Sequence, residues 1–462
     1  MLEFAGNSFY NVHYKKTHVF YISTVGSVSV GERAIQVGLL GLGTVGTGVV
    51  SIVERHQNEL AHQAGRPVAI KKALVKQIDK VRGSEVNGVE LTTNPEDILD
   101  DPDLDVVIEV MGGVSETKQL LEKAIRQKKH IVTANKDLMA EWGASLLALA
   151  AEQGVDVYYE ASVAGGIPIL RTITEGLSAD RITKMMGIVN GTTNYILTKM
   201  SQENRSYEDV LKEAQELGFA EADPTADVEG LDAARKMAIL ATLGFSAPVQ
   251  LSDVAVKGIT NVSGKDLHFC EQLGLTMKLI GVAKRDEGRL EVCVEPTLLP
   301  SDHPLASVQN EYNAVFVHGE AVGETMFYGP GAGSLPTATA VVSDLVSVMK
   351  NMRHRVNGYA AMKPLYEAVF KEEQEKQSQF FIRLHVEDRT GTFSSITSLF
   401  ARYDVSFEKL LQLPLEEEQM AEIVIITHVT NRAVYKELME ELEQLDVVKT
   451  IASSYRVEGG KG

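Results

Sequence analysis

Apolar and polar positions alternate in blocks along the first third of the chain. Residues 35–40 form a short run of mostly branched apolar side chains, and the residues after 46 carry apolar side chains at helical spacing. Similar strand-like runs follow at 68–75, 105–110, 130–134 and 155–159. Strands that alternate with helices in this way are typical of a parallel, doubly wound sheet. We therefore predict an α/β domain over residues 34–160.

The pattern changes after this point. Turns rich in glycine and threonine separate apolar segments, which predicts a mixed α+β domain over residues 161–330. An apolar helical stretch at 337–349 is expected to pack back on the first domain, so that residues 331–365 complete it. The charged, apolar-poor segment 371–377 indicates a linker, which we place at 366–378.

The C-terminal residues 379–460 alternate once more. Their pattern predicts a strand, a helix, two strands, a second helix and a last strand. This βαββαβ order is that of a ferredoxin-like unit.

Composition and charge narrow the class of protein. The length of 462 residues suits about three domains at roughly 150 residues each. The net charge of -18 opposes binding to nucleic acid or to anionic membranes, and no apolar run is long enough to span a bilayer. Two cysteines are too few for a disulfide framework and fit a reducing compartment, so the cytoplasm is expected.

The N-terminal residues 1–33 need a separate interpretation. Lys15 and Lys16 precede an apolar stretch at 19–28, a pattern that faintly imitates a secretory signal. Serine, threonine and glycine dilute that stretch, so we favour an N-terminal extension, such as one added by an upstream start codon, over export.

A glycine-rich loop joins the first predicted strand to the first helix. Gly41, Gly43 and Gly46 form a GxGxxG motif, in which glycines permit a tight turn and bring the backbone close to a pyrophosphate. The strand before and the helix after supply the context that this motif requires. We therefore predict a Rossmann-type domain that binds a dinucleotide.

The end of the second strand bears on the choice of dinucleotide. An acidic residue there holds a ribose 2′-hydroxyl, whereas a basic residue accepts a 2′-phosphate. Lys76 follows this strand, with Asp79, Lys80 and Arg82 close behind. The basic groups favour NADP, with NAD as the alternative and solvated surface charges as the plain interpretation.

Two further segments carry candidate chemistry. Lys136 follows a strand at the sheet edge where such folds bind ligands, although a surface lysine would look the same. In the acidic stretch 218–236, a helix beginning near Asp227 would place Glu229, Asp232 and Lys236 on one face. An exposed ion pair is the plain alternative, but apolar neighbours argue for a partly dry pocket in which Asp232 orients Lys236 for acid–base work.

The segment 160–168 bends sharply after a strand. A carboxylate followed by irregular backbone can offer several oxygens to a hard cation, although a plain turn has the same sequence features. Neither Cys270 nor Cys293 lies in these clusters, and no histidine pair has the spacing of metal ligands. Thiol catalysis and zinc chemistry are therefore disfavoured.

Together these motifs resemble homoserine dehydrogenases of the long bacterial type, over about residues 34–460. The resemblance is carried by the segments 41–46, 133–136, 160–168, 187–195, 221–236 and 331–333. It implies reversible, NAD(P)H-dependent reduction of L-aspartate 4-semialdehyde to L-homoserine, on the route to threonine, methionine and isoleucine. It also implies a homodimer or homotetramer that pairs through the second domain.

The resemblance assigns roles to single residues. Lys236 matches the acid–base lysine, supported by Asp232, and Lys136 matches a lysine between nicotinamide and substrate. Glu221 and Asp227 match residues that line the homoserine pocket. Positions that match the family's cofactor site are Thr44 and Val45 in the glycine loop and Gly333 in the returning segment. Positions that match its sodium site are Glu160, through its side chain, and Val163, Gly165 and Ile167, through their carbonyl oxygens.

The C-terminal unit resembles an ACT domain, a ligand-sensing module that this family links to threonine feedback. One position departs from the usual Asp-x-Pro-Gly turn, which reads Asp388-Arg389-Thr390-Gly391 here. Without the proline the turn is less pre-set. An amino-acid effector is therefore expected, and the choice between threonine and another amino acid stays open.

Two other functions compete with this one. A dehydrogenase acting on an acyl phosphate or another aldehyde would, in the aspartate-semialdehyde class, need a cysteine nucleophile, and both cysteines stand outside the motifs. A non-catalytic regulator that binds a dinucleotide and an amino acid is the second rival. The presence of Lys136, Asp232 and Lys236 argues against it.

Overall fold

A six-stranded parallel sheet forms the N-terminal part of the molecule. The computed structural model describes residues 33–83, 86–357, 363–415 and 419–459. The strands of this sheet follow the order β3-β2-β1-β4-β5-β6, all parallel, which confirms the predicted doubly wound arrangement. Their bounds are β1 Ile35–Leu40, β2 Val68–Leu74, β3 Glu90–Thr92, β4 Val106–Glu109, β5 His130–Thr133 and β6 Val157–Tyr158. The short edge strand β3 was not predicted.

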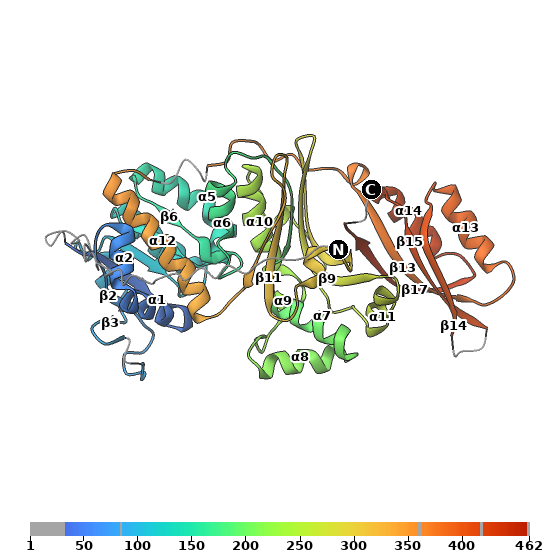
Figure 1. Cartoon of the computed structure of the whole chain (residues 1–462), viewed down its shortest axis with the longest axis horizontal. Helices are drawn as coiled ribbons and strands as arrows, with labels where there is room; N and C mark the ends of the chain where they lie inside the picture. The colour runs from blue at the N-terminus through green and yellow to red at the C-terminus, as the bar shows by residue number, and fades with distance from the viewer. Residues whose placement is uncertain (1–32, 84–85, 358–362, 416–418, 460–462) are drawn as a thin grey trace, which may run out of the picture.

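Helices connect and cover these strands. The segments that belong to this layer are α1 Thr44–Arg55, α2 Gln57–Ala64, α3 Glu96–Leu99, α4 Ser115–Arg126 and α5 Lys136–Gln153. Helix α12, Ser334–His354, returns to this layer as the sequence predicts and lies beside α1 and α2 (Figure 1). It is longer than the predicted 337–349. Its close approach to α1 depends on Gly48, where a Cβ would lie 2.7 Å from the Ser334 carbonyl oxygen.

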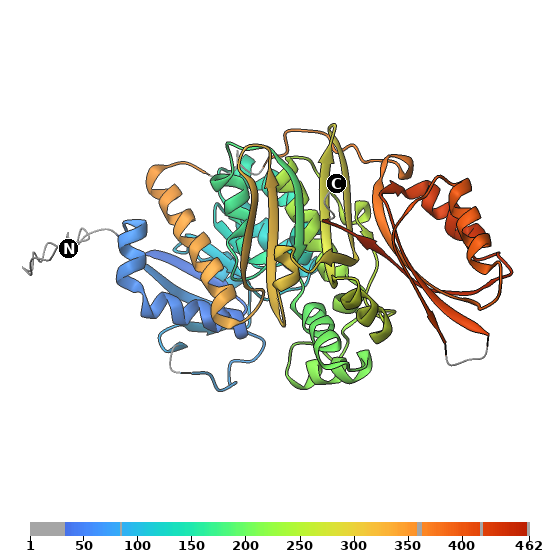
Figure 2. The same cartoon turned by 45° about the vertical axis from the view of Figure 1, so that its right-hand side comes forward.

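The middle of the chain builds a large mixed sheet. Its first strands are β7 Ile182–Ile188, β8 Ala255–Val256, β9 Leu275–Asp286, β10 Arg289–Pro300, β11 Tyr312–Gly319 and β12 Gly323–Pro330. The helices around it are α6 Ile169–Arg171, α7 Gly191–Glu203, α8 Tyr207–Glu216, α9 Thr225–Val228, α10 Leu231–Phe245 and α11 Gly264–Gln272. The first and last parts of the chain lie at opposite ends, with this sheet between them (Figure 2).

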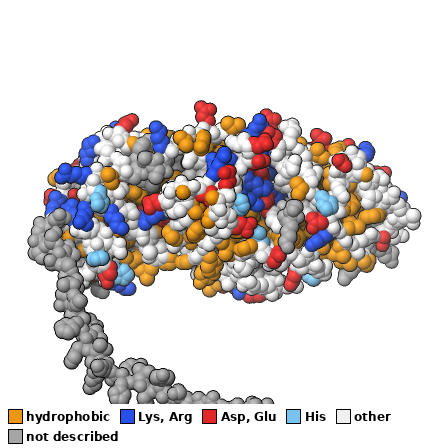
Figure 3. Space-filling view, turned by 45° about the horizontal axis from the view of Figure 1, so that its top comes forward, with side chains coloured by type: hydrophobic (Ala, Val, Ile, Leu, Met, Phe, Trp, Pro, Cys, Tyr) orange, Lys and Arg blue, Asp and Glu red, His pale blue; other side chains and the backbone are white. Residues whose placement is uncertain are grey.

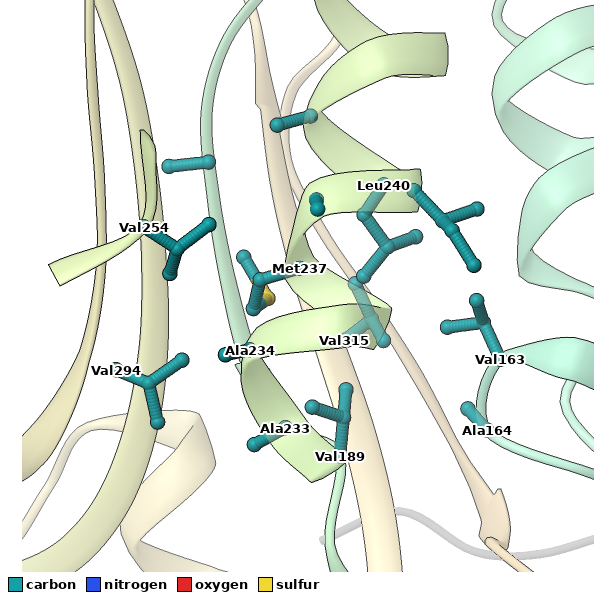
Figure 4. Packing of buried hydrophobic residues seen from close by; sticks show 14 of the residues in the cluster. Val163, Ala164, Val189, Ala233, Ala234, Met237, Leu240, Val254, Val294 and Val315 are labelled. Carbon is teal, nitrogen blue, oxygen red and sulfur yellow. The ribbon is translucent and has the colours of Figure 1, made fainter. Parts of the chain in front are cut away.

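Helix α10 lies in the core of this region. Its buried side chains Met237 and Leu240 pack in one cluster with Val294 of the sheet and with Val163 of the turn after β6 (Figure 4). Gly281 allows this contact, because a Cβ at that position would lie 2.2 Å from Met237 Cγ. The apolar side of α10 therefore fixes where its polar residues point.

The predicted start of this helix was wrong. The sequence suggested a helix beginning near Asp227, but a one-turn helix ends at Val228 and α10 begins at Leu231. Gly230, with φ +82°, separates the two, since this left-handed conformation suits glycine and breaks a helix. Glu229 therefore lies outside α10, whereas Asp232 and Lys236 do share a face.

The C-terminal unit has the predicted βαββαβ order. Its elements are β13 Gln377–Glu387, α13 Thr392–Arg402, β14 Phe407–Pro414, β15 Met420–Thr427, β16 Thr430–Asn431, α14 Arg432–Leu442 and β17 Val448–Val457. The antiparallel order β17-β13-β15-β14 is that of a ferredoxin-like sheet.

This unit continues the middle sheet. Strand β17 pairs with β10 through Thr297 with Arg456 and Leu298 with Val457, which joins the two into one sheet of eleven strands. Within the segment predicted as a linker, the Lys371 N–H donates to the Leu290 carbonyl oxygen at 2.8 Å. The domain boundaries themselves stay a prediction.

Buried charges also join the C-terminal unit to the middle of the molecule. Asp266, at the start of α11, accepts hydrogen bonds from Arg383 Nε at 2.7 Å and from the Tyr455 hydroxyl at 3.0 Å. At the end of the chain, the Glu458 carboxylate accepts from Lys284 Nζ at 2.6 Å and from Lys184 Nζ at 3.0 Å. These contacts hold the ACT-like sheet firmly against the middle region.

Two expectations from the sequence concern the charge of the surface and the absence of a membrane-spanning helix. Acidic and basic side chains are interspersed over the face drawn in Figure 3. Among the described residues, no helix is both long enough and apolar enough to cross a membrane. The predicted extension at residues 1–33 lies outside the described residues except for Arg33.

Candidate active site

The glycine loop has the geometry that a dinucleotide requires. Gly41 has φ +102°, and a Cβ there would lie 2.9 Å from the backbone of Met111. A Cβ at Gly43 would meet nothing within 4 Å, so the space beside the loop is open. Helix α1 begins directly after Gly43 without a side-chain cap and without an acidic residue in its first turn. Its free N–H groups and positive end therefore suit a phosphate.

The returning segment reaches the same loop. Gly333, with φ +124°, precedes α12, and the Ser334 hydroxyl donates to the Thr44 carbonyl oxygen at 2.7 Å. The structure thus brings the Thr44 backbone of the glycine loop next to Ser334, the residue that follows Gly333. The cofactor roles of Thr44, Val45 and Gly333 stay a prediction.

The loop after β2 contains the basic residues that bear on the cofactor. The Arg82 guanidinium donates to the carbonyl oxygens of Gln77, Ile78 and Lys80, so it is held by its own loop. Lys76 follows β2 with an exposed side chain. Lys76 is therefore better placed than Arg82 to meet an anionic group.

Two lysines from different elements form ion pairs with one buried carboxylate, that of Asp232. Asp232 Oδ1 lies 3.0 Å from Lys136 Nζ, and Asp232 Oδ2 lies 2.7 Å from Lys236 Nζ. Lys136 is the first residue of α5, whereas Asp232 and Lys236 lie on α10. Lys236 Nζ also donates to the Val189 carbonyl oxygen at 2.7 Å. The structure therefore joins two motifs that are far apart in the sequence.

These charges shift one another's protonation. Burial alone would raise the pKa of Asp232, but the positive charges of Lys236 and Lys136 hold that pKa well below its usual range. The negative charge of Asp232 in turn raises the pKa of Lys136, against the effect of burial. Asp232 is thus an anion that keeps Lys136 protonated.

Asn190 was not assigned a role from the sequence. Its Nδ2 donates to Asp227 Oδ1 at 2.7 Å and to Asp232 Oδ2 at 2.9 Å. Its Oδ1 caps α7 by accepting the Thr193 N–H at 2.9 Å. An asparagine directly before a helix start is the signal that indicates such a cap, but its bond to two acids depends on the fold.

A cavity of about 870 Å³ adjoins this cluster. Lys136, Asp232, Asp227 and Glu221 line one part of it, and apolar residues of α5 and α10 line another. Burial raises the pKa of Asp227, whereas the Glu221 side chain is exposed. Lys236 is not among the lining residues and contacts Asp232 instead.

The turn after β6 fits the suggested cation site only through its backbone. Both oxygens of Glu160 are used, since Oε1 accepts the Leu170 N–H at 2.7 Å and Oε2 accepts the Arg171 N–H at 2.8 Å. Gly165, with φ +46°, lies so close to Gly331 that a Cβ would be 2.4 Å from its carbonyl oxygen. A cation here would depend on backbone carbonyl oxygens, of which that of Glu160 accepts the Val163 N–H at 3.3 Å and that of Ile167 accepts the Ile169 N–H at 2.8 Å.

In the part of the chain that the structure describes, the other histidine, cysteine and acidic side chains form no metal centre. Within the described ranges, no cluster of three or more histidine, cysteine or acidic side chains could hold a metal ion. Both cysteines are buried, and burial raises the pKa of Cys293 to about 12. A thiolate nucleophile is therefore disfavoured.

Comparison with known proteins connects this site to a family. Three family models match: "Homoserine dehydrogenase, NAD binding domain" over residues 41–160, "Homoserine dehydrogenase" over 168–346 and "ACT domain" over 380–447. The homoserine dehydrogenase of Bacillus subtilis is 63% identical over 428 residues, covering 92% of this chain and 99% of that protein.

Solved structures agree. A homoserine dehydrogenase from Thiobacillus denitrificans matches with a TM-score of 0.87 at 40% identity, covering 92% of this chain and 98% of the other. A hyperthermophilic archaeal homoserine dehydrogenase in complex with NADPH matches with a TM-score of 0.58 at 25% identity, covering 68% and 98%. These matches include the parallel sheet with its glycine loop, the middle domain and the C-terminal unit, and this chain belongs to the homoserine dehydrogenase family.

Proposed function

We propose that this chain reduces L-aspartate 4-semialdehyde reversibly to L-homoserine, with NADPH preferred over NADH, in the biosynthesis of threonine, methionine and isoleucine. The observation that carries the proposal is the convergence of Lys136 and Lys236 on the buried Asp232 beside the cavity. A bound nicotinamide dinucleotide would supply the hydride. Gly41, Gly43, Thr44, Val45, Gly46 and Gly333 are the residues that would hold it.

The two lysines would handle the charge that develops on the substrate. As the aldehyde carbon is reduced, negative charge grows on its oxygen, and a positioned ammonium stabilises that charge and donates a proton. Lys236 is the proposed acid–base residue, and Lys136 the second cation at the carbonyl. Asp232 keeps both oriented, while Glu221 and Asp227 offer carboxylates to the ammonium group of the substrate.

The first test is the oxidation of NADPH and of NADH by the purified chain with aspartate semialdehyde, with and without threonine. We expect turnover with both nucleotides, a lower KM for NADPH, and inhibition by threonine through the ACT unit. Dinucleotide binding without turnover would overturn the proposal in favour of a regulator.

The preference for NADPH gives a prediction for Lys76. Replacing Lys76 with alanine should raise the KM for NADPH on the order of tenfold, because a charge-assisted contact to the 2′-phosphate is lost. The KM for NADH should stay the same, since NADH lacks that phosphate. Lys212→Ala, which removes an exposed lysine of α8 outside the N-terminal sheet domain, is the control. Equal losses for the two nucleotides would contradict the role of Lys76.

A sodium ion is proposed at the turn after β6, held by the carbonyl oxygens of Glu160, Val163, Gly165 and Ile167. Exchanging sodium chloride for choline chloride at constant ionic strength should lower the melting temperature, because a ligand at tenfold its Kd stabilises a protein by about 1.4 kcal/mol. An unchanged melting temperature up to molar sodium would argue against the ion.

The chain is also proposed to form a homodimer or a higher homo-oligomer. Strand β12 lies at the edge of the eleven-stranded sheet and exposes the apolar side chains of Met326 and Tyr328. An open edge with apolar side chains favours pairing with a second chain. Light scattering on the purified protein tests this, and a monomer at all concentrations would contradict it.

A further inference from the structure

A buried carboxylate outside the proposed mechanism stands at the ligand-binding edge of the parallel sheet. Glu109 is the last residue of β4 and its side chain is 0% exposed. Its Oε1 accepts the N–H groups of Met111 at 2.8 Å and Gly112 at 2.9 Å. Its Oε2 accepts the Thr133 hydroxyl at 2.6 Å. Glu109 therefore links the loop after β4 to the end of β5.

The loop after β4 is a neighbour of the glycine loop. A Cβ at Gly41 would clash with the Met111 backbone. The Val110 N–H donates to the Leu40 carbonyl oxygen at 2.9 Å. The Thr117 hydroxyl holds the Gly112 carbonyl oxygen at 2.7 Å. A change in the position of this loop therefore changes the space beside Gly41.

The end of β5 leads directly to a catalytic candidate. The Thr133 hydroxyl accepts the Asn135 N–H at 3.0 Å, and Asn135 Oδ1 caps α5 by accepting the Leu138 N–H at 3.0 Å. Asn135 Nδ2 reaches back to the Gly113 carbonyl oxygen at 2.7 Å, which closes the network onto the loop after β4. The next residue is Lys136.

We propose that Glu109 is a positioning residue. It fixes the loop beside the dinucleotide site relative to the start of α5, and in this way it places Lys136 correctly for the substrate. This inference rests on the proposed function, because it assumes the role of Lys136. Glu109 itself acts only through the backbone of residues 111–112 and the Thr133 hydroxyl.

The chain offers a matched control for this network. Thr92 also ends a strand, β3, and its hydroxyl donates to Asp97 Oδ2 at 2.5 Å and accepts the Asn94 N–H at 3.0 Å. Thr92 is 6% exposed and Thr133 is 0% exposed. The Thr92 hydroxyl also lies 3.3 Å from the Asn94 carbonyl oxygen. Thr92→Val thus removes a bond to an acidic side chain and a bond from a backbone N–H, as Thr133→Val does, without touching Glu109 or α5.

The experiment compares Glu109→Gln, Thr133→Val, Thr133→Ser and Thr92→Val with the unchanged chain. NADPH affinity is measured by fluorescence titration without turnover, and kcat and the melting temperature are measured alongside. We expect Glu109→Gln and Thr133→Val to weaken NADPH binding and to lower kcat, each on the order of tenfold or more, since small misplacements at a reacting centre are costly. Thr133→Ser, which keeps the hydroxyl, and Thr92→Val should retain both quantities.

Two results would overturn the inference. One is a Thr133→Val variant that loses stability as Thr92→Val does but keeps NADPH affinity and kcat. The other is a Thr133→Ser variant as impaired as Thr133→Val. If Glu109→Gln fails to fold, the three threonine variants decide the question. Absence of turnover in the unchanged chain would instead refute the proposed function. The NADPH titrations would still test, in that case, whether Glu109 positions the loop after β4.

Discussion

Replacing Lys236 with alanine should lower kcat for the reduction of aspartate semialdehyde on the order of 10³-fold, because the reaction loses its proton donor. NADPH affinity should stay nearly unchanged. The Lys236 ammonium contacts Asp232 and the Val189 carbonyl oxygen, and neither belongs to the glycine loop. Steady-state kinetics and a fluorescence titration with NADPH measure the two quantities separately.

Lys199→Ala is a suitable control for this variant. Lys199 pairs with Glu203 at the same i,i+4 spacing as Asp232 and Lys236, with an Nζ to Oε1 distance of 2.7 Å, but it is away from the cavity. Its activity should match that of the unchanged chain. Loss of NADPH binding with normal turnover per bound enzyme in Lys236→Ala would refute the assignment.

Replacing Asp232 with asparagine should have the second largest effect. The change leaves Lys136 and Lys236 without their shared counter-ion and should lower kcat on the order of 100-fold. Because the charge of Asp232 raises the pKa of Lys136, that pKa falls in the variant. Lys136 then loses its proton at a lower pH. The alkaline limb of the pH profile for semialdehyde reduction should therefore move to lower pH.

A second buried carboxylate separates this effect from simple destabilisation. Asp266 is 1% exposed and bonds to Arg383, far along the chain at the junction with the C-terminal unit. Asp266→Asn should lower the melting temperature as well, but its alkaline limb should stay in place. A shift of equal size in both variants would mean that the pH profile reports stability and not the protonation of Lys136.

Local pattern was sufficient for much of the fold. The run at 35–40 matches β1 residue for residue, and the strand–glycine–helix order predicts the position of the glycine loop from local sequence alone. The pattern misplaced the start of α10, because Gly230 in a left-handed conformation looks in the sequence like any helix-adjacent glycine. Strand β3 was missed since it is short and lies at the edge of the sheet.

The site was predictable only in part. The i,i+4 spacing of Asp232 and Lys236 places them on one helix face, so this pair could be predicted without knowing the tertiary fold. The contact of Lys136 with Asp232 could not be predicted in this way, because the two residues lie on helices that pack against different sheets. The position of Asn190 between Asp227 and Asp232 likewise depends on the fold. So does the role of Glu109, because its place in a strand indicates only burial and not the three hydrogen-bond donors that surround its carboxylate.

The pairing of β17 with β10 has a consequence for the order of folding during synthesis. Strand β10 ends at Pro300, but its partner is among the last strands to leave the ribosome. The buried Arg456 and Glu458, which bind Glu291 and Lys284, arrive later than every other part of the middle region. Contacts between residues so distant in sequence form slowly. Part of this edge is covered early, because β8 pairs with Cys293 and Val294 of β10. Until β17 has been synthesised, however, the growing chain must carry Thr297 and Leu298 without their strand partner, and the middle domain is complete only once β17 has docked.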